Sequence, residues 1–140
     1  MNLTSEIIKK KAKDLGADAV AIGNIERWNG APIQMDPRQI MPEAKSIIAM
    51  AFRIMRGSFR GIEEGTFFSN YSSMGYGGLT YLYIPMVVIN LSKFIEDNGF
   101  ETIPYGHQSD WRAFDNQLEI KKITVDQLLQ EKQGRMLWYI

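Results

Sequence analysis

The chain has 140 residues, of which 45% are apolar, 11% aromatic and 23% charged, a composition typical of one globular domain over residues 1–140. It contains no cysteine, which excludes a thiolate nucleophile, a thiolate zinc site and an iron–sulfur cluster held by this chain alone. Sixteen Lys and Arg residues balance sixteen Asp and Glu residues. Because the chain therefore has no overall basic field, we expect no nucleic acid among its partners.

The N-terminal residues 1–13 are charged and have the pattern of a helix rather than of a secretory signal, so we expect a cytoplasmic protein. The longest apolar stretch, residues 79–91, is about 13 residues long and is interrupted by Pro85 and Asn90. A helix that crosses a bilayer needs about 20 apolar residues. The sequence therefore predicts a buried helix here and no membrane segment.

A helix followed by a strand opens the chain. Thr4 is a suitable N-cap, Glu6 lies in the first turn of the helix, and Gly16 is a suitable residue for its end. Residues 19–25 follow as a short run of small and β-branched apolar residues, which is typical of a buried strand.

Two further strands are predicted. Residues 46–52 form a continuous apolar run, typical of a strand covered on both faces, and residues 100–105 are a third, shorter candidate. Between the first two strands, residues 26–41 carry turn dipeptides, with at most one helical turn at 37–40. With a final helix at 125–132, the predicted fold class is α/β, a small central sheet with flanking helices.

Residues 53–78 are rich in glycine and aromatic side chains, and so long a segment is unusual as a plain loop. We expect it to be partly helical, docked on a partner or functional. A helix then covers residues 79–97, with Pro85 near its first turns and Asn98-Gly99 as its stop. This helix is apolar almost all round, so we expect a homodimer that buries it.

The sequence Gly75-Tyr76-Gly77-Gly78 stands at the start of this helix. Backbone N–H groups without side chains around them can approach an anion at a helix start. The third glycine of G-x-G-x-x-G is missing, however, and close packing of the backbone on a neighbouring element is the more common reason for such glycines. The sequence leaves both interpretations open.

Several tyrosines and arginines lie in and before the same helix. A phenol is a proton donor or an apolar filler with a polar tip, and an arginine binds an anionic ligand or solvates a loop. The sequence does not decide between these roles. The single histidine, His107, lacks companion ligands, so no metal site is predicted. The tyrosines and arginines whose roles stay open in this way are Tyr71, Tyr76, Tyr81, Tyr83, Arg53, Arg56 and Arg60.

Four segments carry a resemblance to a known family. Residues 11–22 read KAKDLGADAVAI, residues 26–32 read ERWNGAP, residues 40–48 read IMPEAKSII, and residues 94–101 read FIEDNGFE. Together with Ile103-Pro104 and Trp111-Arg112, they resemble the epoxyqueuosine reductase and reductive dehalogenase-like family over about residues 3–116. The remaining residues, 117–140, diverge from it.

The resemblance implies a nitroreductase-like α/β domain that binds cobalamin, which in the family precedes a ferredoxin-like domain with two iron–sulfur clusters. Because this chain has no cluster cysteines, electrons would have to come from a separate ferredoxin-like donor. The family's reductases place an acidic proton donor where this chain reads Pro104-Tyr105-Gly106, and related dehalogenases use a tyrosine. The resemblance thus implies Tyr105 and Tyr76 as catalytic candidates, and Tyr71, Gly75, Gly77 and Tyr81 as cofactor contacts.

Two functional hypotheses follow. The chain is the N-terminal domain of a reductase-like protein that binds cobalamin and depends on a separate iron–sulfur electron donor. Alternatively, it is a non-catalytic dimeric scaffold or a small-ligand-binding module derived from such an enzyme. A flavin at the dimer interface is a third interpretation, which rests on analogy of fold alone.

Overall fold

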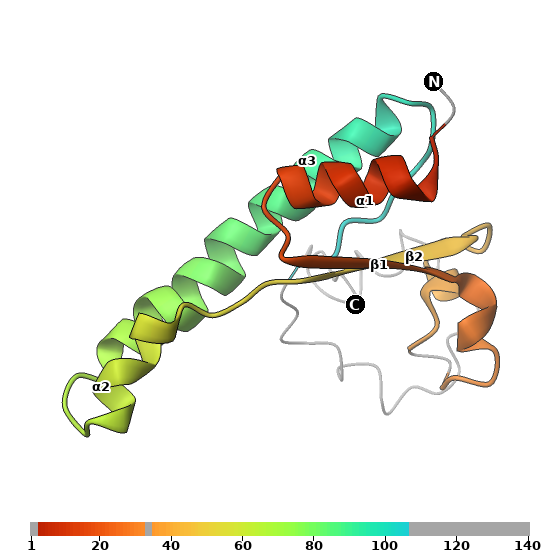
Figure 1. Cartoon of the computed structure of the whole chain (residues 1–140). Helices are drawn as coiled ribbons and strands as arrows, with labels where there is room; N and C mark the ends of the chain where they lie inside the picture. The colour runs from red at the N-terminus through yellow and green to blue at the C-terminus, as the bar shows by residue number, and fades with distance from the viewer. Residues whose placement is uncertain (1–2, 33–34, 107–140) are drawn as a thin grey trace, which may run out of the picture.

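The computed structural model describes residues 3–32 and 35–106 and is a mixed α/β structure (Figure 1). Its described elements are α1 (Ser5–Asp14), β1 (Ala19–Asn24), β2 (Ser46–Ala51), α2 (Arg60–Glu63), the π-helical segment η5 (Tyr71–Tyr83) and α3 (Ile84–Glu96), with 3-10 turns at Ile25–Trp28, Pro37–Gln39 and Arg56–Phe59. The predicted α/β class is confirmed at this level. The predicted helix at 125–132 lies outside the described residues.

Helix α1 begins and ends as its sequence predicts. The backbone N–H of Ile7 donates to the hydroxyl of Thr4 at 3.4 Å, so Thr4 caps the first turn. Gly16 follows the last turn with φ +119°, a backbone conformation that residues with a side chain rarely adopt. Ala12 is fully buried on the inner face of the helix, which directs α1 onto α3 and the sheet.

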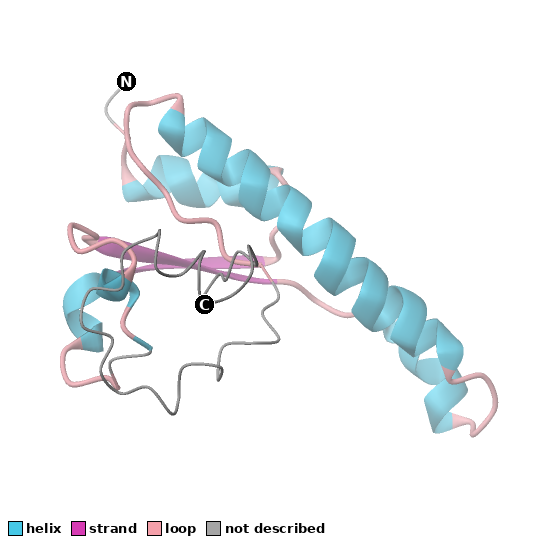
Figure 2. Ribbon diagram, turned by 180° about the vertical axis from the view of Figure 1, so that it is seen from behind, coloured by secondary structure: helices cyan, strands magenta, loops and turns pink. Residues whose placement is uncertain are grey.

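The sheet has two antiparallel strands, with Ala19 opposite Ala51. Val20, Ile48 and Met50 point to the face that packs against α1 and α3, and both views place these two helices on the same side of the sheet (Figure 2). The other face carries Ala19, Ala21, Ala49 and Ala51, all exposed. The prediction that residues 46–52 are covered on both faces is therefore wrong, because Ala49 and Ala51 stay exposed on this face.

Residues 100–106 do not form the predicted third strand. Pro104 has no backbone N–H for a strand ladder. In addition, the Thr102 hydroxyl donates to the Glu96 carboxylate at 3.0 Å, which ties the segment to the end of α3. The segment therefore runs past the sheet without joining it.

The long helix begins earlier than the sequence predicts. It runs from Tyr71 to Glu96, because η5 continues directly into α3. Pro85 lies in the first turn of α3, which is the interior of the continuous helix and not its first turns as predicted. The predicted stop is confirmed, since Gly99 takes φ +88° and the Asn98 side chain donates to the Phe94 carbonyl at 2.8 Å.

The same helix is less buried than predicted. Within Tyr71–Glu96, Gly75, Val87, Leu91 and Ile95 are buried, while many of its larger apolar side chains are exposed. Its 26 residues have a mean hydropathy of 1.4 in their most apolar window, so by length and composition alone the helix is long enough to cross a membrane. The helix thus extends eight residues further toward the N-terminus than the predicted range 79–97. α3 lies against α1 and near the sheet, whereas η5 projects beyond them together with α2 (Figure 1).

Candidate ligand pocket

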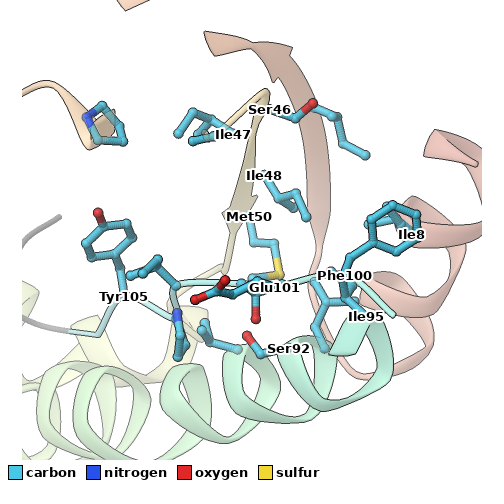
Figure 3. Close-up of a pocket in the computed structure, with 18 of the residues that line it drawn as sticks. Ile8, Ser46, Ile47, Ile48, Met50, Ser92, Ile95, Phe100, Glu101 and Tyr105 are labelled. Carbon is cyan, nitrogen blue, oxygen red and sulfur yellow. The ribbon is translucent and has the colours of Figure 1, made fainter. Parts of the chain in front are cut away.

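A pocket of about 860 Å³ lies between the sheet, α3 and the segment that follows α3 (Figure 3). Its volume falls within the range of roughly 300–1,000 Å³ that small-molecule sites usually have. It is neither an enclosed cavity nor a flat surface, so part of it is open to solvent.

Regular spacing on two elements builds two sides of its wall. Ile48 and Met50 alternate along β2 and point to the same face of the sheet. Val88, Leu91, Ser92 and Ile95 recur three and four residues apart on α3, so they share one side of that helix. The wall is therefore mainly apolar. Further lining residues come from α1, both strands, the segments flanking β2, α3 and the segment after α3, among them Ile8, Ile22, Pro37, Met41, Lys45, Ile47, Phe52, Ile84, Phe100, Ile103 and Pro104.

A few polar groups are set into this apolar wall. Figure 3 shows Tyr105 at one end of the pocket, Ile8 and Phe100 at the other, and Ser92 and Glu101 between them. Burial raises the pKa of the Tyr105 phenol above its usual value, so the group stays protonated at neutral pH. Tyr105 can therefore donate a hydrogen bond to a ligand, whereas the Glu101 carboxylate can accept one.

The structure does not bring the two catalytic candidates into one site. Tyr105 lines the pocket, but no residue of η5 does. Tyr76 instead packs edge to face against Tyr81, with ring centroids 5.8 Å apart. Hydrogen bonding to Tyr81 raises the pKa of the Tyr76 phenol above its usual value. The Tyr71 ring lies against the Phe59 ring, with ring centroids 5.4 Å apart. This pair belongs to the contact between the 3-10 turn Arg56–Phe59 and η5.

The glycines of η5 pack against the protein rather than forming an open cradle. A Cβ atom on Gly75 would lie 3.0 Å from the Ser58 Cβ and 3.1 Å from the Tyr71 ring. On Gly77 it would lie 3.1 Å from the Ser72 carbonyl oxygen. These distances favour the packing interpretation of the Gly75-Tyr76-Gly77-Gly78 sequence.

The residues named as cobalamin contacts are not brought together in this pocket. Gly75 is covered by neighbouring side chains, and Tyr71, Gly77 and Tyr81 lie outside the pocket. Among residues 3–32 and 35–106, no three His, Asp or Glu side chains gather as metal ligands.

The three arginines each pair with a carboxylate. Arg56 binds Glu63 at 2.8 Å, and Arg60 binds Glu64 one helical turn further along. The Arg53 guanidinium lies 3.3 Å from the carboxylate of Asp18, which also accepts the Arg53 backbone N–H at 2.9 Å. These exposed pairs favour a structural role for the arginines at the surface.

Sequence reasoning named Tyr105 but missed most of the pocket. Met50, Ser92 and Glu101 were not singled out, because apolar and small polar residues carry no chemical signature on their own. Apolar residues recur every two residues along β2 and every three or four residues along α3, and this spacing indicates which face of each element points inward. That pattern does not reveal that the space between the two faces stays open.

Comparisons with known proteins add no identification. The sequence matches no known protein family, and comparisons with characterised proteins and with solved structures find no significant match. The resemblance of residues 3–116 therefore stays a prediction, and the pocket is the basis for the proposed function.

Proposed function

We propose that this chain is a small-ligand-binding module and that its ligand occupies the pocket between β2 and α3. The observation that carries the proposal is a cavity of about 860 Å³ whose walls are mainly apolar and whose polar groups are few. Sites for organic ligands typically combine an apolar lining with a small number of hydrogen-bonding groups that set orientation.

The lining defines the class of ligand. Aliphatic side chains such as Ile48, Val88 and Ile95 favour a ring system or a hydrocarbon portion, at about 25 cal/mol for each Å² removed from water. The protonated phenol of Tyr105 suits a hydrogen-bond acceptor on that ligand. Glu101 suits a donor or a cationic group.

A second candidate function is favoured by the position of Tyr105. The resemblance implies a proton donor at this point of the chain, and Tyr105 is a protonated phenol that faces the pocket. On this proposal the chain is the nitroreductase-like, substrate-facing part of a cytoplasmic reductase, and a separate ferredoxin-like protein supplies the electrons. The residues named for cobalamin do not line this pocket, so the proposal assigns no role to that group there.

Binding of three probes to the full chain tests the proposal. The probes are 8-anilinonaphthalene-1-sulfonate, flavin mononucleotide and hydroxocobalamin, each followed by its own fluorescence or visible spectrum. The variant Ser92→Trp fills the pocket from α3. Ser73→Trp is its matched control, because Ser73 is an exposed serine on η5 outside the pocket.

We expect at least one aromatic probe to saturate one site per chain, with affinity reduced at least tenfold by Ser92→Trp and unchanged by Ser73→Trp. Equal binding by both variants, or no saturable binding of any probe, contradicts the proposal. A saturable shift of hydroxocobalamin that requires Tyr105 favours the reductase candidate over a plain binding module.

A further inference from the structure

One surface of the long helix is apolar and exposed. Leu82, Met86 and Ile89 are four and three residues apart, so they share one face of the helix, opposite the buried Val87, Leu91 and Ile95. Tyrosines and a further methionine extend this surface along η5. We define the apolar helix surface as Met74, Tyr76, Tyr81, Leu82, Met86 and Ile89, whose side chains are 40–69% exposed.

The area of this surface matches what a protein interface needs. Side chains of this size carry roughly 150–250 Å² each, so at these exposures the six together offer on the order of 500–800 Å². A standard stable interface buries about 800 Å² per partner. The largest apolar patch on an ordinary monomer is usually smaller, at about 300–600 Å².

The surface carries no charge that would select an unlike partner. Residues 65–92 contain no Asp, Glu, Lys or Arg. At the projecting tip, Arg56 pairs with Glu63 and Arg60 pairs with Glu64, so the cationic groups beside η5 are neutralised. An apolar surface without charge is complementary to a copy of itself, because the contact buries no unpaired ion.

A lipid bilayer fits the surface less well than a second copy does. The C-terminal half of the helix is occupied by the protein, since Leu91 and Ile95 pack on Ala12 and Ala17, and Lys11 lies 5.2 Å from the Phe94 ring centre. Residues 71–82 remain, with a length of at most about 18 Å, against a hydrocarbon core of about 30 Å. A helix that lies in the membrane surface usually carries Lys and Arg on its polar face, and η5 has none.

We infer that a second copy of this chain docks on the apolar helix surface, in a two-fold contact that pairs the long helices. The contact covers Leu82, Met86 and Ile89 on both copies at once. It lies on the side of the helix that faces away from α1, so it leaves the ligand pocket free and does not depend on ligand binding.

The molecular mass of the full chain in solution tests this interface. At micromolar concentration we expect sedimentation equilibrium to give twice the chain mass of 16.0 kDa. Met86→Glu places one charge per copy in the contact, and we expect it to raise the dimer dissociation constant about a hundredfold. Met35→Glu is the matched control, because Met35 is 52% exposed, close to the 59% of Met86, but lies in the loop between β1 and β2, away from η5 (Figure 1). Circular dichroism establishes that both variants are folded.

A second measurement does not depend on a disruptive substitution. Because the chain has no cysteine, Leu82→Cys and Met35→Cys each provide a single thiol for a short bis-maleimide cross-linker. We expect a covalent dimer from Leu82→Cys and none from Met35→Cys. A monomeric wild-type chain, or a dimer that Met86→Glu leaves intact, overturns the inference. A monomer that co-floats with phosphatidylcholine vesicles overturns it in favour of a lipid surface.

Discussion

The phenol of Tyr83 donates a hydrogen bond to the backbone oxygen of Gly16 at 3.2 Å and so joins the long helix to the turn between α1 and β1. The Tyr83 ring also packs edge to face on Phe52, with centroids 6.0 Å apart. Gly16 has to be a glycine here for two reasons. Its φ of +119° suits no side chain, and a Cβ atom would overlap the Tyr83 hydroxyl.

Gly16→Ala is therefore expected to destabilise the fold by about 3 kcal/mol or more, through backbone strain and the clash with Tyr83. Gly30→Ala is the control, because Gly30 also has positive φ (+85°) but open space around it, and it should cost about 1–2 kcal/mol. Urea unfolding of both variants measures the difference. Equal losses would show that the contact between Gly16 and Tyr83 does not constrain the helix.

Gly61→Ala should also destabilise the chain, because the added Cβ would overlap the backbone carbonyl of Phe67, which cannot move as a side chain can. We expect a loss of about 2–3 kcal/mol. Gly57→Ala lies in open space at the preceding 3-10 turn and should be neutral or slightly stabilising. Thermal unfolding of the pair measures this, and a neutral Gly61→Ala variant would contradict the close approach of α2 to Phe67.

Asp36 gives the fold a pH-dependent contribution. Hydrogen bonds from the Arg38 side chain and backbone lower the pKa of its carboxyl below the usual value. The folded-state pKa is thus below the unfolded-state pKa, so the stabilisation is complete above about pH 4 and is lost as pH falls through the folded-state pKa.

The variant Asp36→Asn keeps a side-chain acceptor at the start of the 3-10 turn but removes the charge. We expect it to be less stable than the wild type at pH 7, with a difference that shrinks as pH falls through the folded-state pKa of Asp36. Urea unfolding at several pH values measures the free energy of unfolding of both proteins. A difference between them that is constant with pH would refute the assigned role of the Arg38 contact.

Tyr105 should make the fold sensitive to alkali. Because burial raises its pKa in the folded state, its contribution to stability is present below the unfolded-state value of about 10 and is lost as pH rises through the folded-state pKa. Tyr105→Phe should therefore lose less stability than the wild type between pH 9 and pH 12. Parallel losses in the two proteins would mean that the phenol is not buried in the pocket.

The local elements could be predicted from the sequence because short-range signals define them. Thr4 and Gly16 mark the two ends of α1, the apolar runs give β1 and β2 to within one residue, and Asn98-Gly99 ends the long helix. Each of these signals acts through a cap, a turn or a strand pattern within a few residues.

Features that depend on tertiary packing could not be predicted in this way. The π-helical start at Tyr71 includes three glycines that normally oppose helix formation, and it is held by contacts such as that between Gly75 and Ser58. The apolar residues 100–105 read as a strand, but Thr102 and Pro104 prevent pairing with β2. Residues 100–105 line the pocket instead of extending the sheet, which no local pattern reveals.

The most direct test of the ligand pocket is the methyl NMR spectrum of the chain labelled at its methionines, recorded with and without a saturating aromatic probe. Met41 and Met50 line the pocket, whereas Met35, Met55 and Met74 do not. We expect the probe to shift the methyl signals of Met41 and Met50 and to leave those of Met35, Met55 and Met74 unchanged. Shifts confined to Met74 and Met86 on the apolar helix surface, or no shift at Met50, would contradict it.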